Sequence, residues 1–374
     1  MPQIILEHIH KRFEKFVAVE DLNLVIEDRG FVTLLGPSGC GKTTTLRMIA
    51  GLETPTSGRI LIDGVPVYDS EKGINLPPNK RDIGFLFQNY ALWPHMTVYQ
   101  NIAFGLEMLK WDRKKIENRV DEMLRLLKIE QFVKRYPAEL SGGQQQRVAI
   151  ARTLAPSPRV LFMDEPLSNL DAKLRGEMRT ELKRLHSDTN STFVYVTHDQ
   201  LEAMTLSTRV CLMETGRLQQ YAPPLEIYNR PANTFVASFV GNPTMNFIPA
   251  QVRDRTEKTV SLELLGKQAL FSSDSPLENP GREVILGVRP EFLPIREDGA
   301  LTAAIYSTLP AGMETTVKAV CGDTMLTSVV FGSVDYPVDA RVRMEVTGEN
   351  IVLFDRESTR QVGVGSLKIS GAGG

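Results

Sequence analysis

The chain has 374 residues, of which 42% are hydrophobic and 24% charged, and its formal net charge is -2. This composition fits a globular protein of two or three domains, because one hydrophobic core rarely serves a chain of this length. The near-neutral charge argues against a protein whose main work is binding nucleic acid, although a local basic patch stays open.

The cysteines and the apolar runs bear on where the protein works. Three widely spaced cysteines, Cys40, Cys211 and Cys321, form neither a disulfide framework nor a metal-ligand pattern, which fits a reducing compartment. We expect no secretory signal, because charge follows a very short apolar run at the N-terminus. No apolar stretch approaches the roughly 20 residues that span a bilayer, so work at a membrane would require a partner.

Alternating apolar residues predict short strands within residues 3–30. Phe13 and Phe16 stand just upstream of a glycine-rich loop, and either could offer a flat face on which adenine stacks. The alternative is an aromatic side chain half-buried on a strand, and the spacing alone does not decide between the two.

The glycine-rich stretch 36–44 matches G-x-x-x-x-G-K-[ST] between an apolar strand-like run, 31–35, and a helix-compatible run. The glycines let successive N–H groups face an anion, and the helix adds the positive end of its dipole. Lys42 can reach the β- and γ-phosphates of a nucleotide, and the Thr43 hydroxyl can ligate Mg²⁺. A turn without a ligand is the alternative, which the register of these two residues disfavours. The loop consists of Gly36, Pro37, Ser38, Gly39, Cys40, Gly41, Lys42, Thr43 and Thr44.

The apolar run 83–87 predicts another strand, which ends at the polar residue Gln88. The aromatic-rich loop 89–95 comes next. This pattern suggests a site joined to a docking surface, whereas the alternative for Tyr90 and Trp93 is packing beneath the loop.

The sequence Leu-Ser-Gly-Gly-Gln at 140–144 leads into a further expected helix. Ser141 is a good N-cap, and Gln144 stands at the capping-box position. Gly142 and Gly143 expose N–H groups to which an anion could bind. The alternative is an ordinary capped helix, but two glycines cost helix stability and imply a compensating use.

Two further strands end in charged or titratable residues. The apolar run 160–163 ends in Asp164, which is placed to hold Mg²⁺, and Glu165, which could orient and polarise an attacking water. The strand expected at 192–196 is followed by His198, which could bond a γ-phosphate, although a lone histidine is more often structural. The alternation of strands and helices predicts a mainly parallel α/β sheet, whose ligands bind at the carboxyl ends of the strands, where all these residues stand.

The pattern changes after residue 220, where prolines punctuate a linker. Short turn-bounded β-type segments from about 245 to 356 predict a small all-β barrel. The tail 361–374 is rich in Gly and Ser, and we expect it to be disordered.

Taken together, these segments resemble the ATP-binding cassette family. The phosphate loop, the Gln88 loop, Leu-Ser-Gly-Gly-Gln, the strand ending in Asp164-Glu165, Ser-Asn-Leu-Asp at 168–171 and His198 occur in the family's order and spacing, over residues 3 to about 235. Leu-Ser-Gly-Gly-Gln separates this family from other phosphate-loop proteins.

The C-terminal half extends the resemblance. Residues 231–241, 245–247 and 287–291 look like the carbohydrate-uptake importer ATPases of the maltose and glycerol-3-phosphate type, which carry a regulatory β domain like an oligonucleotide-binding (OB) fold. Residues 308–316 depart from the usual pattern of that domain, which leaves its regulatory contacts open.

The resemblance implies an α/β phosphate-loop ATPase domain at 1–235, with a helical subdomain at about 89–158. An all-β OB-fold-like regulatory domain would follow at 236–360, and a disordered tail at 361–374.

The resemblance also implies a head-to-tail homodimer that sandwiches two ATP with Mg²⁺. Each ATP would touch the phosphate loop of one subunit and residues 141–144 of the other. The implied roles are general base for Glu165, γ-phosphate contact for His198, sensor of Mg²⁺ and water for Gln88, support of the dimer contact for Asp171, and adenine stacking for Phe13. Thr43, Gln88 and Asp164 would serve the metal.

The implied function is that of the ATP-hydrolysing subunit of a bacterial-type importer for a sugar or sugar derivative. It would lie peripherally on the cytoplasmic face of the inner (plasma) membrane, bound to two transmembrane permease subunits. An extracytoplasmic solute-binding protein would deliver the solute to these permeases. A polyamine, iron or anion importer is the nearest alternative. A DNA-repair cassette ATPase would need a long coiled coil that residues 41–141 cannot hold, and a nucleic-acid-binding barrel lacks an evident basic and aromatic groove, so no nucleic-acid partner is expected.

Overall fold

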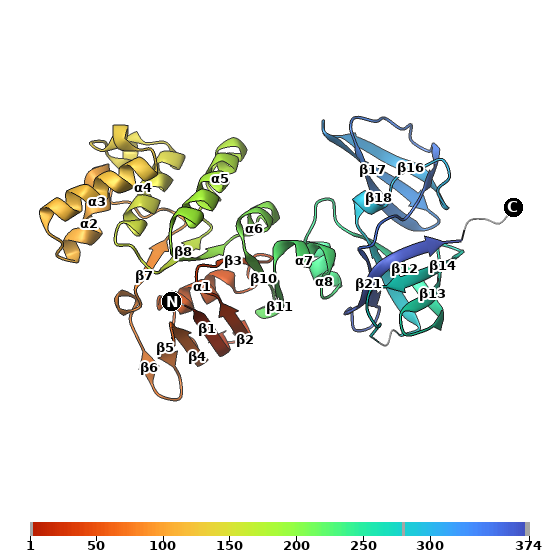
Figure 1. Cartoon of the computed structure of the whole chain (residues 1–374), viewed down its shortest axis with the longest axis horizontal. Coiled ribbons are helices and arrows are strands. Elements are labelled where there is room, and N and C mark those ends of the chain that lie inside the picture. Colours follow the sequence, from red (N-terminus) through yellow and green to blue (C-terminus); the bar gives the residue numbers. More distant parts are fainter. Residues whose placement is uncertain (1–2, 279–280, 371–374) are drawn as a thin grey trace. The chain divides into compact units, whose positions relative to one another are not determined.

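A computed structural model describes residues 3–278 and 281–370 of the chain, which divides into two compact units, residues 1–224 and 225–374 (Figure 1). In the described part of the chain, no helix is long and apolar enough to cross a membrane.

The central sheet of the first unit has the order β11-β10-β3-β9-β8-β7 and is parallel except for the pair β10–β11, as expected from the sequence. Its inner strands are buried on both faces, which is typical of parallel sheets covered by helices. The strands are β3 (Phe31–Leu35), β7 (Ile83–Leu86), β8 (Val160–Asp164), β9 (Thr192–Val196), β10 (Arg209–Glu214) and β11 (Arg217–Ala222).

Alternate residues of the inner strands build two separate cores. Phe31 and Tyr195 pack with the helices α2–α5, while Val32 and Val196 face the other side, toward α1 and a second sheet. That second sheet is antiparallel in the order β2-β1-β4-β5-β6. Its strands are β1 (Ile4–Phe13), β2 (Phe16–Ile26), β4 (Ser57–Ile62), β5 (Val65–Asp69) and β6 (Ile74–Asn75).

The helices of this unit match the expected α/β alternation. Three of them, α2, α3 and α4, gather together inside the region 89–158 expected to be a helical subdomain (Figure 1). The strand expected at 192–196 is β9. The helices are α1 (Lys42–Ala50), α2 (Val98–Met108), α3 (Arg113–Leu126), α4 (Gly142–Leu154), α5 (Ala172–Asp188) and α6 (Gln200–Leu206).

The second unit is a β domain preceded by two short helices. A closed six-stranded barrel packs with a four-stranded sheet of order β18-β17-β16-β19 around a shared core. The helices are α7 (Pro224–Asn229) and α8 (Thr234–Phe239). The barrel strands are β12 (Asn246–Arg255), β13 (Thr259–Leu264), β14 (Lys267–Ser273), β15 (Glu283–Val288), β20 (Ile351–Asp355) and β21 (Gln361–Ile369), and the sheet strands are β16 (Leu301–Pro310), β17 (Glu314–Cys321), β18 (Thr324–Phe331) and β19 (Arg341–Met344).

The boundary between the units falls near residue 224 rather than at 235. The reason is Arg289, which is fully buried and ties α7 and α8 to the barrel. Its guanidinium donates to the carbonyls of Tyr228, at 2.8 Å, Ala237, at 3.1 Å, and Val240.

The expectation of a disordered tail is wrong for residues 361–369, which form β21 and close the barrel between β14 and β20. The glycines there serve close packing. A Cβ on Gly365 would lie 1.9 Å from the Ser272 carbonyl oxygen, and one on Gly363 would lie 2.5 Å from the Leu277 side chain. The last part of the expected tail, residues 371–374, lies outside the described residues.

Candidate nucleotide-hydrolysis site

The glycine-rich loop follows β3 and runs into α1, the context that a phosphate-binding loop requires. Two of its glycines have positive φ angles and leave no room for a side chain. A Cβ on Gly36 would lie 2.2 Å from the Met213 carbonyl oxygen, and one on Gly41 would lie 2.4 Å from that of Ala18. Among the described residues, no side chain caps the N-terminus of α1, so its first N–H groups are available to an anion.

Lys42 lies buried at the centre of this loop. Its ammonium group donates to the carbonyl oxygens of Gly36, at 2.7 Å, and Pro37, at 2.8 Å. Cys40 Sγ lies 3.7 Å from the same nitrogen. Burial raises the pKa of the Cys40 thiol, with Lys42 lowering it in part, so the sulfur has little thiolate character. Of the remaining loop residues, Ser38 and Gly39 are exposed, and Pro37, Thr43 and Thr44 are half-buried.

Thr43 and Asp164 meet at the edge of the sheet. The Thr43 hydroxyl donates to Asp164 Oδ1 at 2.8 Å, and Arg47 Nη2 lies 3.6 Å from Asp164 Oδ2. Burial raises the pKa of Asp164, while the bond from Thr43 and the charge of Arg47 lower it in part. Arg47 is an addition to the predicted set, and its position four residues after Thr43, on the same helix face, is the signal that could have found it.

These oxygens fit Mg²⁺, a hard ion that usually takes one or two carboxylates and completes its shell with water and phosphate oxygens. Within the described ranges, no three His, Cys, Asp or Glu side chains cluster into a metal site by themselves. The protein oxygens of Thr43 and Asp164 would therefore supply only part of the shell.

Glu165 and His198 also lie together, because β8 and β9 are adjacent and parallel, with Asp164 opposite Val196. Glu165 has a left-handed φ of 45° and its N–H donates to the Val196 carbonyl. This conformation turns its carboxylate toward the end of β9, where His198 Nδ1 lies 3.3 Å from Glu165 Oε2. The His198 side chain is 59% exposed, so a ligand can reach it.

Gln88 joins this group through two residues that the sequence interpretation did not assign. Its Nε2 donates to Ser168 Oγ at 3.4 Å, and Asn169 Nδ2 donates to the Gln88 carbonyl at 3.2 Å. Ser168 in turn donates to the Glu165 carbonyl at 2.8 Å. The signal was present in Ser-Asn-Leu-Asp, but its contact with the Gln88 loop depends on the fold.

Residues 141–144 and Asp171 make local interactions in this chain. Ser141 caps α4, and Gln144 completes the capping box. Asp171 caps α5 by accepting from the Leu174 N–H at 2.9 Å. Gly143 has a packing use, since a Cβ there would lie 2.6 Å from the Leu174 side chain.

Phe13 and Phe16 lie opposite each other at the hairpin of β1 and β2. They are 43% and 58% exposed, so solvent or a ligand can reach part of each ring. Lys11 Nζ lies 4.4 Å from the Phe13 ring centroid.

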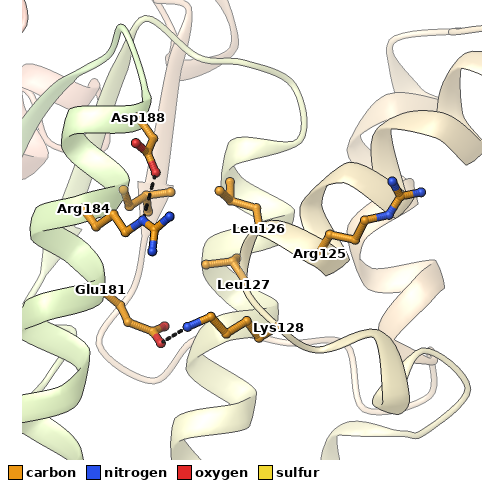
Figure 2. Close-up of a pocket in the computed structure, with 8 residues that line it drawn as sticks. Arg125, Leu126, Leu127, Lys128, Glu181, Arg184 and Asp188 are labelled. Carbon is orange, nitrogen blue, oxygen red and sulfur yellow. Dashed lines mark ion pairs between the residues drawn. The ribbon is translucent and has the colours of Figure 1, made fainter.

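A cavity of about 200 Å³ lies in the first unit, between the C-terminal end of α3 and α5. Figure 2 shows its lining, with Lys128 reaching Glu181 and Arg184 paired with Asp188. None of the predicted nucleotide-site residues lines it.

The comparisons with known proteins agree with the geometry. The family model described as ABC transporter matches residues 19–168, and the model described as MalK OB fold domain matches residues 241–293.

Relatives match most of the chain. It is 41% identical over 374 residues to the uncharacterized ABC transporter ATP-binding protein YurJ of Bacillus subtilis (strain 168), covering 97% of this chain and 100% of that protein. It is 52% identical over 296 residues to the trehalose/maltose import ATP-binding protein MalK of Thermococcus litoralis, covering 78% and 79%. The oligosaccharides import ATP-binding protein MsmX of Bacillus subtilis (strain 168) is 41% identical over 361 residues, covering 95% and 96%.

Solved structures match about 60% of the chain. The cbiO1 protein of Clostridium perfringens, part of the cbiONQ transporter complex, has a TM-score of 0.55 at 32% identity, covering 60% of this chain and 89% of that one. The dimeric post-hydrolysis structure of the cassette MJ0796, bound to ADP and Pi, has a TM-score of 0.51 at 32% identity, covering 59% and 98%. The phosphate loop, the converging strand ends and these matches together show that the chain is an ATP-binding, ATP-hydrolysing protein of the ABC transporter family with a MalK-type OB-fold domain.

Proposed function

We propose that this chain powers the import of a sugar or sugar derivative by hydrolysing ATP. The observation that carries the proposal is the match over both units to import ATP-binding proteins for trehalose/maltose and for oligosaccharides, together with the MalK OB-fold domain. A fold alone would not support a function, and the strand-end contacts of Thr43 with Asp164 and of Glu165 with His198 support this proposal as well.

The proposed chemistry follows from the strand-end cluster. Glu165 accepts a proton from the attacking water, a contribution of about 10²–10⁴-fold in rate for a positioned general base. His198 holds the Glu165 carboxylate and contacts the γ-phosphate with its exposed imidazole edge. Lys42 turns its ammonium group from the loop carbonyls to the phosphates.

Thr43, Asp164 and Gln88 would hold Mg²⁺, which neutralises phosphate charge when it is bound. Arg47 and Thr43 favour the ionised form of Asp164 that would bind the metal, because both lower its pKa against the effect of burial. Phe13 would stack on adenine, since it is exposed and lies on β1 beside Lys11.

A second copy of the chain completes the site in this proposal. Residues 141–144 present a helix N-terminus with two glycines, and donors of this kind stabilise charge on a γ-phosphate once the copies close over ATP. Asp171 would support the contact between copies. Two membrane permeases would bind at the Gln88 loop on the cytoplasmic face of the inner membrane, and a solute-binding protein would deliver the sugar to them.

The catalytic part is tested with Glu165→Gln in the full chain. We expect ATP hydrolysis to fall by about 10²–10⁴-fold, the contribution of a general base, with nucleotide affinity and melting temperature retained. Glu71→Gln, in the exposed turn after β5, is the control and should hydrolyse ATP at the wild-type rate. A Glu165→Gln protein as fast as wild type would refute the assignment.

The transport part is tested by purifying the chain from membranes of its source cells and identifying what accompanies it. We expect two multi-span permeases and a solute-binding protein that binds a sugar in a ligand screen. A homodimer without membrane partners would overturn the importer assignment. A binding protein that takes a polyamine, iron or an anion would overturn the sugar assignment alone.

A further inference from the structure

A network of charged side chains lies behind the hydrolysis site, centred on Arg175 in the first turns of α5. Its Nη2 donates to the Leu170 carbonyl at 3.1 Å, and its Nη1 donates to Asp199 Oδ2 at 3.5 Å. Its Nε is buried without a hydrogen-bond partner in the described chain, and the carboxylate oxygen Glu202 Oε1 lies 3.9 Å away. One guanidinium therefore touches the turn before α5 and the segment that carries His198.

The two carboxylates that face Arg175, those of Asp199 and Glu202, hold the backbone before and after His198. Buried Glu202 accepts from the hydroxyls of Thr197 and Tyr195, each at 2.7 Å. Asp199 accepts from the first N–H groups of α6, at 2.8 Å from Leu201. The Asp199 N–H donates to the Thr197 hydroxyl at 3.0 Å, which closes the network around the histidine.

The same guanidinium also reaches the turn that runs on from Glu165. Leu170 precedes Asp171, the N-cap of α5, and its carbonyl is an Arg175 acceptor. Ser168, two residues earlier, donates to the Glu165 carbonyl. The Arg175 fork thus spans the two segments from which Glu165 and His198 project, and a planar fork with fixed donors suits such bridging better than a single ammonium.

We propose that Arg175 is a positioning residue for ATP hydrolysis, which, with Glu202 and Asp199, holds the His198 segment in register with the turn from Glu165 to Asp171. The 3.3 Å contact between His198 and Glu165 then depends on a residue that touches neither of them. This inference rests on the proposed role of His198, and displacement of a catalytic group by about 1 Å can cost about 10²-fold in rate.

The test is a double-mutant cycle in the full chain, with Arg175→Met, His198→Ala and the two combined. We expect Arg175→Met to lower kcat by about 10–100-fold with KM for ATP within about twofold, because positioning acts on the reaction step. In the His198→Ala background, the same substitution should change kcat by less than about twofold, since residues that act as one unit are not additive.

Two further variants keep the test interpretable. Glu202→Gln removes the charge that faces Arg175 but keeps an oxygen for Tyr195 and Thr197, so it should fold, lower kcat less than Arg175→Met, and also lose its effect without His198. Arg184→Met is the matched control, because Arg184 lies on the same helix, is 79% exposed and pairs with Asp188 (Figure 2). It should leave kcat and KM unchanged.

Losses from Arg175→Met and Glu202→Gln that multiply with the loss from His198→Ala would overturn the inference, as would unchanged kcat in both variants. Either result would leave the proposed function standing as long as Glu165→Gln lowers hydrolysis by about 10²–10⁴-fold. If Arg175→Met does not fold, the cycle with Glu202→Gln decides the question by the same criterion.

Discussion

Arg152, near the C-terminal end of α4, holds the loop that follows Gln88, and its removal should release that loop. Its guanidinium donates to the carbonyls of Tyr90, at 2.7 Å, and Ala91, at 2.6 Å, and lies 4.8 Å from the Trp93 ring centroid. Tyr90 and Ala91 both have left-handed φ angles, of 60° and 47°. The arginine therefore binds the two carbonyls that a strained turn presents.

The magnitudes show why the loop depends on this side chain. Two hydrogen bonds from a charged donor contribute about 1.5–3 kcal/mol each. Burial lowers the pKa of the Arg152 guanidinium, so desolvation opposes part of that gain. Left-handed conformations cost non-glycine residues about 1–2 kcal/mol each, or about 2–4 kcal/mol for the pair. Removing Arg152 removes the gain from its hydrogen bonds while the strain remains, so a net loss of about 2 kcal/mol or more should raise the ratio of released to held loop by about 30-fold or more.

The variant Arg152→Met is best read through Trp93, which should become more accessible when the loop is released. The chain has two tryptophans, so a Trp111→Phe background isolates the signal of Trp93. We expect faster acrylamide quenching and earlier proteolytic cleavage in the loop than in Trp111→Phe alone. Quenching and cleavage equal to that control would refute the reasoning.

Two other substitutions test burial in the two units. Arg289→Met should destabilise the second unit by about 3–5 kcal/mol, because three carbonyls, two of them in buried hydrogen bonds, lose a charged donor. Calorimetry should show the unfolding transition of the second unit at a lower temperature, while the unfolding of the first unit, followed by tryptophan fluorescence, keeps its midpoint. A shift of both transitions, or of neither, would contradict this. Burial raises the pKa of Asp164. A carboxyl whose pKa is higher in the folded state than in the unfolded state stabilises the fold at pH values below its unfolded pKa, and this stability is lost as pH rises through the folded pKa. Asp164→Asn should therefore raise the melting temperature of the nucleotide-free protein at pH 7, with a gain that shrinks as pH falls, and a lowered or pH-independent melting temperature would count against it.

The cluster of candidate site residues could be predicted from the sequence because these residues are tied to strand ends. Each of Gly36, Gln88, Asp164 and His198 follows an apolar run, and parallel strands bring their carboxyl ends to one edge. The parallel pairing of β8 and β9 brings the segments that carry Glu165 and His198 to the same edge of the sheet. Local signals such as caps also set α5, whose N-cap is Asp171.

Other features were decided by tertiary structure alone. Glycine is typical of disorder and of close packing alike, and only the neighbours of Gly363 and Gly365 show that the tail belongs to the barrel. Arg152 and Arg289 bind backbone carbonyls of distant segments. Because every residue type carries a carbonyl, such an acceptor leaves no trace in the sequence, and the partners of these arginines are determined only when the chain has folded.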